Sequence, residues 1–509
     1  MSRMSHFIDR HSKETTGVLS CFDRVVISGT LPLICHAAAM TKYVTSLGIR
    51  VFDFTKFAEP LREEIRSNAE KLAAESGLKI DFIRRLNFRK EDRIHAILRE
   101  RGEHPGLVHI FSAMENCASF TPWYDKTNGR AMLKPRGGKC LHYYFYFIDP
   151  SLGLCYLRVP TWAPFRLQFY FNGHNHLASK LKANGIGYRK QDNAFVHVDD
   201  TAKAQALADE LDARVLHKRL DRIARTYCPI VERFRCSYHW SLMQVEYSTD
   251  VLFRSQAGFK PLYEALTYTA IHAVKPEHIA TFLGRKLTAD HRGEVDSDFD
   301  TRIQGTRIKH RMGTAASIKL YDKFGVVLRV ECTANDVTFF KHHRKVVHRD
   351  GTSQFKLAPL AKSIYSLHDL RQLLADANRR YLDFLAAIDD PTPGVRDLDK
   401  ISRPAHEGPR SYRGFNLFHG EDLDLFLSIV RGEFTISGFQ ARNLRNAMPA
   451  ISGARISRML KRLRTHGLIK KIGNRYKYYL TQLGRRVAVT ALKLRELVVI
   501  PSLASSAAH

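Results

Sequence analysis

The stretch ARISRMLKRLRTHG, residues 454–467, is the most informative segment of the sequence. Its apolar residues recur at helical spacing, at positions 456, 459, 460 and 463, and so form one face of an amphipathic helix. Gly467 follows the last turn and is suited to end the helix. The segment predicts a helix with a cationic outer face that fits the major groove of DNA. These cations are Arg455, Arg458, Lys461, Arg462 and Arg464.

The segments on both sides extend this pattern. Two helices are predicted before it, at 423–430 and at Ser437–Ala447, with Ser437 as an N-cap. After it, LIKKIGNRYKYYLT (468–481) predicts two short strands joined at Gly473-Asn474, and a last helix begins at Gln482. Helix, helix, basic helix and hairpin is the order of a winged helix. The cations expected to reach flanking phosphates from the wing are Lys470, Lys471, Arg475 and Lys477.

This part of the chain resembles MarR-like winged helices over about 75 residues, above all in ISRMLKRLRTHGLIKK and YYLTQLG. The resemblance implies a winged-helix fold and binding to duplex DNA. From Thr435 to the end, fifteen Lys and Arg stand against one acid, Glu496. The alternative interpretation is a solvated pair of basic helices that packs on the first domain.

The whole chain is also basic. Its 80 Lys and Arg against 51 Asp and Glu give a net charge of +29, which indicates a polyanionic partner. The N-terminus does not resemble a signal peptide, and no apolar run is long enough to span a membrane. The eight cysteines lack the paired spacing of a zinc or disulfide framework. We therefore expect a cytoplasmic, nucleoid-associated protein, and a homodimer is compatible with the sequence.

Before the winged helix, strands and helices mix in an order that favours an α+β fold on antiparallel sheets. Strands are predicted at 24–27, 107–111, 140–148, 154–159 and 167–171, and helices near 36–47, 57–76 and 177–183. Four parts are expected: an α+β basic domain at 1–225, a second α+β domain at 226–388, a linker at 389–414, and the winged helix at 415–509. The linker is predicted from four prolines and three glycines without apolar periodicity.

The best candidate for catalysis is SIKLYDKFGVVLRVE, residues 317–331, which alternates on both sides of Phe324-Gly325 and so predicts a hairpin. With a loop of two or four residues, Asp322, Arg329 and Glu331 share one face of the hairpin. Just upstream lie cations suited to a phosphate backbone: Arg307, Lys309, His310 and Arg311.

The YDK…LRVE arrangement, with Lys323 in its first half, resembles an element of rolling-circle replication initiators. Those proteins nick DNA with a tyrosine and a carboxylate-bound metal. The resemblance implies Glu331 and then Asp322 as metal ligands, and a downstream nucleophile, Tyr381 first and Tyr365 in reserve. Asp322 and Glu331 would lie roughly 13 Å apart along the ladder, which is too far for one ion unless the hairpin is bulged. The alternative is a charged surface hairpin with a cross-strand ion pair.

A second acidic set consists of Asp23, beginning the strand FDRVVISG, Asp149, ending YYFYFID, and the run from Glu294 to Asp300. Acids at strand ends are able to assemble a two-metal site for phosphoryl transfer. We therefore keep Asp23 and Asp149 as metal candidates, with Mg²⁺ or Mn²⁺ as the expected cofactor. An Asp that closes a strand is also a common turn former.

Two further segments bear on the partner. KPRGGK, Lys134–Lys139, is a basic glycine-rich segment that is able to present backbone amides to phosphate. The strands HYYFYF (142–147) and QFYF (168–171) offer aromatic faces for unpaired bases, or form part of a core.

Taken whole, the chain also resembles bacterial proteins that join an uncharacterised α+β body to a MarR-like C-terminus and look like products of mobile elements. The shared phrases include FDRVV, YFYFID and FLGRK. We expect a DNA-processing protein: a nickase, recombinase or replication initiator. The alternatives are a non-enzymatic winged-helix regulator and a structured-RNA-binding protein.

Overall fold

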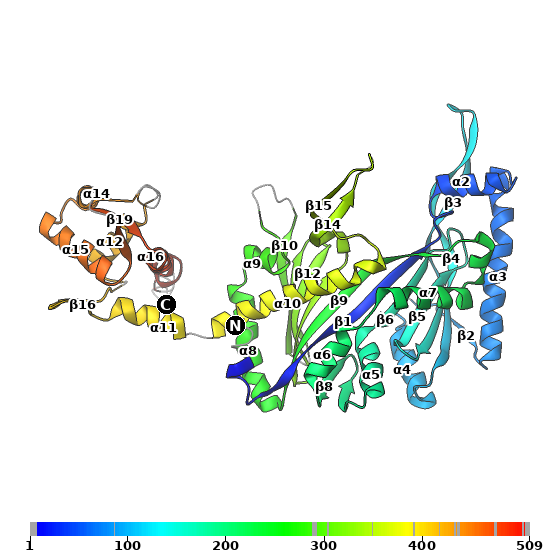
Figure 1. The fold of residues 1–509 in the computed structure, drawn as a ribbon, viewed down its shortest axis with the longest axis horizontal. Helices are drawn as coiled ribbons and strands as arrows, with labels where there is room; N and C mark the ends of the chain where they lie inside the picture. Colours follow the sequence, from blue (N-terminus) through cyan, green and yellow to red (C-terminus); the bar gives the residue numbers. More distant parts are fainter. Residues whose placement is uncertain are drawn as a thin grey trace. The chain divides into compact units, whose positions relative to one another are not determined.

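The chain forms two compact units, Met1–Asp389 and Asp390–His509 (Figure 1). The structure, a computed structural model, describes residues 8–500 and 503, except 86, 288–292, 303–304, 349, 390–391, 417, 432–433, 435–437 and 473–475. The predicted boundary between 225 and 226 is absent, because one sheet runs through both predicted domains. The predicted α+β class and the antiparallel sheet are confirmed.

The first unit is built on an eleven-stranded sheet in the order β10-β11-β12-β13-β9-β1-β6-β5-β4-β3-β2. Neighbouring strands are antiparallel except for the pair of β2 with β3. The strands are β1 (Thr15–Thr30), β2 (Ile80–Phe82), β3 (Gly106–Asp125), β4 (Arg130–Asp149), β5 (Gly153–Pro160), β6 (Leu167–Asn172), β9 (His239–Phe253), β10 (Val295–Arg302), β11 (Gly305–Met312), β12 (Ala316–Lys323) and β13 (Val327–Ala334). Two separate hairpins are β7 (Tyr188–Gln191) with β8 (Ala194–Val198), and β14 (Lys341–Val347) with β15 (Ser353–Pro359).

The centre of the sheet explains why residues 1–389 fold as one body. Strand β1 pairs with β6 on one side and with β9 on the other, so the expected second domain supplies a direct neighbour of the first strand. Figure 1 shows β1 and β9 side by side as the two longest central strands.

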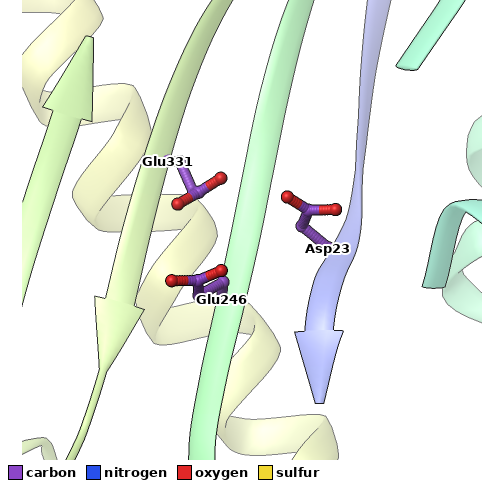
Figure 2. A group of neighbouring side chains, drawn as sticks. All are labelled: Asp23, Glu246 and Glu331. Carbon is purple, nitrogen blue, oxygen red and sulfur yellow. The ribbon is translucent and has the colours of Figure 1, made fainter. Parts of the chain in front are cut away.

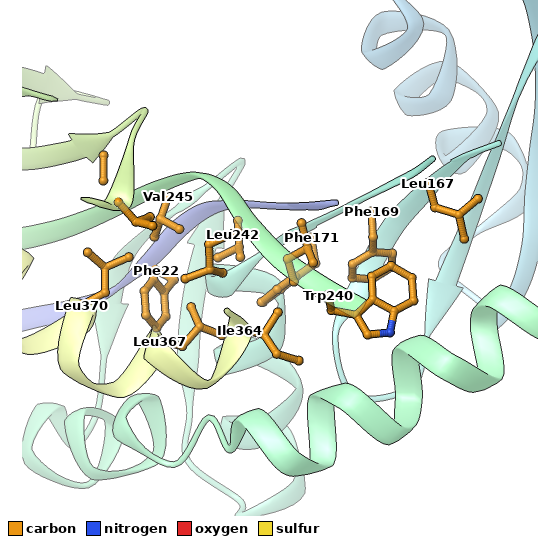
Figure 3. Close-up of a cluster of buried hydrophobic side chains, with 14 of the residues drawn as sticks. Phe22, Leu167, Phe169, Phe171, Trp240, Leu242, Val245, Ile364, Leu367 and Leu370 are labelled. Carbon is orange, nitrogen blue, oxygen red and sulfur yellow. The ribbon is translucent and has the colours of Figure 1, made fainter. Parts of the chain in front are cut away.

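One face of the sheet carries most of the apolar core. Phe22, Val245 and Trp240 lie on this face beside Ile364, in the short 3-10 turn before α10, and Leu367, the first residue of α10 (Figure 3). The burial of a continuous apolar layer on both the sheet and the helices is the dominant stabilising contribution here. The helices of the first unit are α2 (Ala37–Ser46), α3 (Phe54–Glu75), α4 (Lys90–Arg101), α5 (Gly173–Ala183), α6 (Thr201–Asp209), α7 (Ala213–Tyr227), α8 (Gln256–Ala273), α9 (Pro276–Phe282) and α10 (Leu367–Asp389).

The opposite face is covered only in part. Helices α5 and α6 and the β7–β8 hairpin pack a smaller apolar cluster on it, which includes Leu19, Cys21, Leu177 and Phe195. Asp23 follows next along the same face of β1, since residues two apart point to the same side of a strand. Buried charge on this face of β1 therefore begins directly beyond the smaller apolar cluster.

Strands β3 and β4 form a long arm. They pair from Gly106↔Ile148 to Asp125↔Arg130, whereas β5 covers β4 only from His142 to Asp149. Among the described strands, none pairs with the outer part of β4 on this edge, here called the free edge, and this part contains the predicted KPRGGK segment.

The second unit holds α11 (Thr392–Ser402), β16 (Ala405–Glu407), β17 (Arg410–Tyr412), α12 (Gly420–Ile429), α14 (Ala441–Ala447), α15 (Gly453–Thr465), β18 (Ile469–Ile472), β19 (Lys477–Leu480) and α16 (Gln482–Leu494). The predicted linker at 389–414 is wrong in that it contains a helix and a short hairpin. Pro393 is the second residue of α11, where the missing N–H costs no hydrogen bond, and Ile401 packs into the core. Helices α12, α14, α15 and α16 and the β18–β19 hairpin lie in the segments where helices and a hairpin were predicted, while Ser437 and residues 473–475 lie outside the described part.

Candidate functional site

Three carboxylates from neighbouring strands converge on the polar face of the sheet. Asp23 of β1, Glu246 of β9 and Glu331 of β13 each offer an oxygen, and these oxygens lie within 4.8 Å of one another (Figure 2). Asp23 and Glu331 were predicted as separate metal candidates, and the structure brings them together with Glu246.

A β-bulge in β1 helps to create this cluster. Phe22 pairs with Tyr247 and Val25 with Val245, so Asp23 and Arg24 together lie opposite the single residue Glu246. A bulge of this kind turns a side chain relative to the regular ladder. Glu331 reaches the same place from the other side of β9, where it pairs with Ser248.

Two side chains of β12 contact the buried Glu331. The Lys319 ammonium donates to Glu331 at 2.6 Å and to Glu246 at 3.1 Å, and the Tyr321 hydroxyl donates to Glu331 at 2.6 Å. Burial raises the pKa of Glu331, and the negative charges of Glu246 and Asp23 raise it further, against the opposing effect of Lys319.

Arg329 is the centre of a second, fully buried group. It donates two hydrogen bonds of 2.7 Å to the carboxylate of Asp250, one of 3.4 Å to Asp23 and one of 2.7 Å to the carbonyl of Asn193. His174, from the first turn of α5, lies 2.9 Å from Arg329 through Nε2 and 3.2 Å from Asp23 through Nδ1. The Arg329 guanidinium thus faces Nε2 of the ring, while Nδ1 of the same ring faces the Asp23 carboxylate.

These partners keep Asp23 ionised. Burial alone would raise the pKa of the Asp23 carboxyl, but the Arg329 charge and the hydrogen bonds from His174 and Asn193 outweigh it and lower the pKa far below its usual range. Arg329 thus both fixes the direction of Asp23 and favours its charged form.

The donor set fits a hard divalent cation. Three carboxylates supply only oxygen ligands, the chemistry that Mg²⁺ and Mn²⁺ prefer. In the combined network the four carboxylates of Asp23, Glu246, Asp250 and Glu331 face the cations Lys319 and Arg329 and the ring of His174, so carboxylates outnumber basic groups. The side chains of Glu246 and Lys319 are 16% and 17% exposed, against 2% for Glu331, so the cluster opens to solvent on their side. A metal there would displace the Lys319 ammonium from Glu331.

No protein family, curated protein or solved structure matches the chain. No described helix is long and apolar enough to cross a membrane.

Asp322 does not belong to the cluster, which corrects the predicted hairpin register. The turn has three residues, 324–326, with Phe324 and Gly325 at φ 60° and 71°. This length shifts the register by one, so that Tyr321, which lies across from Arg329, shares the face of Arg329 and Glu331, and Asp322 does not. Asp322 instead accepts a hydrogen bond from the Gly325 amide, and burial raises its pKa to about 6.

The predicted nucleophile is also misplaced. Tyr381 is completely buried on α10, where its hydroxyl lies 2.8 Å from Nε2 of His310. His310 lies on the same side of the sheet as Ile318 and Cys332, its partners across β12 and β13, and Cys332 alternates with Glu331. Tyr381 and His310 therefore lie on the opposite face from the carboxylates. The reserve, Tyr365, is half exposed and contacts His217 at 2.7 Å.

Most of the remaining predicted residues of the first unit have ion-pair or hydrogen-bond partners. Lys323 lies 3.4 Å from Asp192, and Arg307 and Arg311 pair with Asp300 and Asp296 across β10. Lys309 is half-buried on β11. Asp149 is a turn former, because its carboxylate accepts from the amides of Ser151 and Leu152 and pairs with Arg219. The upstream cations thus do not form the free phosphate-binding set that was predicted.

The outer face of α15 carries fewer cations than predicted. Arg462 is buried: its guanidinium binds both oxygens of Asp422 at 2.6 and 2.9 Å and lies over the Phe415 ring. Arg455 pairs with Glu421, and Lys461 and Arg464 pair with Glu407. Arg458 and Lys470 are exposed, and within the described chain neither has a carboxylate at ion-pair distance. Lys471 and Lys477 lie over the rings of Tyr476 and Tyr479, and Arg475 lies outside the described residues.

Sequence reasoning missed Glu246, Asp250 and Lys319. A signal was present in the segment VEYSTDVLF, residues 245–253, where two acids four apart interrupt an otherwise strand-forming run. This spacing places both carboxylates on one face of a buried strand, which is costly unless they have partners.

Proposed function

We propose that this protein binds duplex DNA through its C-terminal unit, which acts as a winged helix with α15 as the recognition helix. The observation that carries the proposal is the pair of exposed cations Arg458 on α15 and Lys470 on β18, which lack carboxylate partners within the described chain. Helices α12, α14 and α15 followed by the β18–β19 hairpin support this assignment. The acids that pair with Arg455, Lys461 and Arg464 restrict the contact to the exposed part of the helix.

We further propose that the first unit cleaves or transfers a DNA strand with the help of a divalent metal, as the DNA-processing protein of a mobile element. Asp23, Glu246 and Glu331 would hold the ion, which supplies charge stabilisation at the phosphate. Lys319 would stabilise negative charge beside it, and Arg329 would orient Asp23. Because Tyr381 is buried on the opposite face, we propose attack by water or a DNA hydroxyl.

A non-enzymatic DNA-binding regulator is the second candidate. The contact of 2.6 Å between Lys319 and Glu331 favours it, because an internal ammonium already partly compensates the carboxylates. In that case the buried network only holds strands β1, β9, β12 and β13 together.

Duplex binding tests the first proposal. The variant Arg458→Ala with Lys470→Ala is expected to weaken binding of a labelled duplex about tenfold and to reduce the slope of log K against log salt by about 0.9 per lost phosphate contact. The measurement is fluorescence anisotropy over a range of salt concentrations. The control, Arg485→Ala with Lys493→Ala on α16, removes the same charge from other exposed positions and should change affinity less than twofold. Equal losses in the two variants would show attraction by net charge and contradict the recognition helix.

Cleavage separates the two candidates. Incubation of the full-length protein with supercoiled plasmid should give nicked DNA with Mg²⁺ or Mn²⁺ and none with EDTA, as resolved on denaturing gels. Tight, salt-dependent binding without any metal-dependent product would favour the regulator. A protein-linked DNA end would contradict attack by water or a DNA hydroxyl.

A further inference from the structure

A basic groove lies at the base of the β3–β4 arm. In the strand order of the sheet, β6 and β5 separate this arm from the strands of the carboxylate cluster. It has a volume of about 650 Å³ and is lined by α3, β3, β4 and the residues after β5. Its cations are Arg62, Arg66, Arg136 and Lys139, and none of the described residues that line it is Asp or Glu. The groove is therefore a cationic surface enclosed on more than one side.

The cations differ in their partners. Arg62 and Arg66 share the exposed carboxylate of Glu63 at 3.4 and 3.1 Å, on α3 outside the groove lining. Arg136 and Lys139 are exposed on β4, and no carboxylate of the described chain lies at ion-pair distance from either. At least these two cations are available to an external anion.

Backbone donors face the same place. Leu133 directs its amide away from β3 to the Thr41 hydroxyl at 2.9 Å, and Leu141 directs its carbonyl to the Thr161 amide on that edge. Because hydrogen-bonding direction alternates along a strand, the amides of Gly137 and Lys139 point to this free edge as well. The edge thus combines N–H donors with ammonium and guanidinium groups.

Close packing does not explain why positions 137 and 138 are glycine. A Cβ atom built at Gly137 or Gly138 meets nothing within 4 Å, and neither residue has the positive φ that favours glycine. Glycine inside a strand often marks a site where another backbone approaches closely. Apolar surface is also present, since Trp162, Phe120 and the exposed Met114 line the groove.

We propose that this groove binds a single-stranded nucleic acid, with phosphates on Arg136, Lys139 and the amides of the free edge and with bases against the apolar wall. The volume is in the range of pockets that hold one small ligand, so it suits single nucleotides of an opened strand rather than a duplex. The identity of the strand as DNA rests on the function proposed above.

The test uses the full-length protein and three labelled probes: oligothymidylate of about 16 nucleotides, oligouridylate of the same length, and a duplex. Arg136→Ala with Lys139→Ala should weaken oligothymidylate binding about tenfold and lower its salt slope by about 0.7 per cation removed. Duplex binding should stay within twofold, because it depends on the other unit. Gly137→Glu, whose Cβ meets open space, should give a similar loss, whereas Gly137→Ala should not.

The matched control is Lys126→Ala with Arg130→Ala, two exposed cations at the tip of the arm outside the groove. Unchanged oligothymidylate binding in the groove variant, or an equal loss in the tip control, would overturn the proposal. Oligouridylate bound at least tenfold more tightly than oligothymidylate, and lost in the groove variant, would overturn the assignment to DNA. Failure of the groove is distinct from failure of the proposed function, since duplex binding and plasmid nicking are read separately.

Discussion

Glu246→Gln is expected to reduce metal-dependent plasmid nicking about 100-fold or more, while duplex affinity changes less than about twofold. The substitution removes one oxygen ligand and one negative charge from the three carboxylates that would hold a divalent ion. A metal ion contributes several kcal/mol of charge stabilisation in such reactions, and each 1.36 kcal/mol is a factor of ten in rate. The measurement is the initial rate of nicking across a range of Mn²⁺ concentrations.

Glu246 is preferred to Glu331 for this experiment because it is partly exposed and, among the described residues, accepts only from Lys319 and, weakly, from Thr333. Its glutamine variant keeps an acceptor for Lys319. The control is Glu115→Gln, which alters a carboxylate of β3 that pairs with Arg158 and lies outside the cluster. Glu331→Gln should repeat the loss. Full activity of both cluster variants would rule out the metal centre.

Arg329→Met is expected to lower the free energy of unfolding of the first unit by about 3–5 kcal/mol, the usual result of leaving buried charges without their partner. The substitution removes every charge-assisted hydrogen bond that Asp250 receives from Arg329. It leaves Asp23 with Asn172, Asn193 and His174 as its partners. Urea unfolding followed by tryptophan fluorescence measures this unit alone, because Trp123, Trp162 and Trp240 all lie in it.

Two further variants test the interpretation. Arg307→Met breaks the exposed ion pair with Asp300 and should cost less than about 1 kcal/mol. Arg329→Met combined with Asp250→Asn should recover part of the loss, because the second change removes the uncompensated charge. A loss below about 1 kcal/mol for Arg329→Met alone would contradict a network held together by this residue.

Local patterns predicted much of the secondary structure. The helix expected near 36–47 is α2, the strand at 167–171 is β6, and the basic segment at 454–467 forms α15. These elements depend on periodicity and on caps, which short stretches of sequence contain. The domain boundary at 225 failed because the pairing of β1 with β9 joins residues far apart, and no local pattern encodes it.

The candidate site, too, could be predicted only in part from local sequence patterns. Glu331, Arg329 and Asp23 were recognisable as unusual charges in apolar strands. Which side chains surround them depended on two details of the backbone. A turn of three residues placed Tyr321 instead of Asp322 on the face of the carboxylate cluster. A bulge at Asp23 brought its carboxylate beside Glu246. Arg462 was assigned to the wrong face of α15, because helical spacing does not reveal the buried Asp422 that it binds.

The pairing of β1 with β9 has a consequence during synthesis. Thr30, at the end of β1, lies beside His239, which is 209 residues later in the chain. At a translation rate of about 5–20 residues per second, β1 leaves the ribosome roughly 10–40 s before its partner is made. During that interval one edge of a long strand has no neighbour, and unpaired edges are where nascent chains aggregate. Pairing of β1 with β6 covers only the other edge of β1, so the edge that meets β9 stays open until residues 239–253 are made.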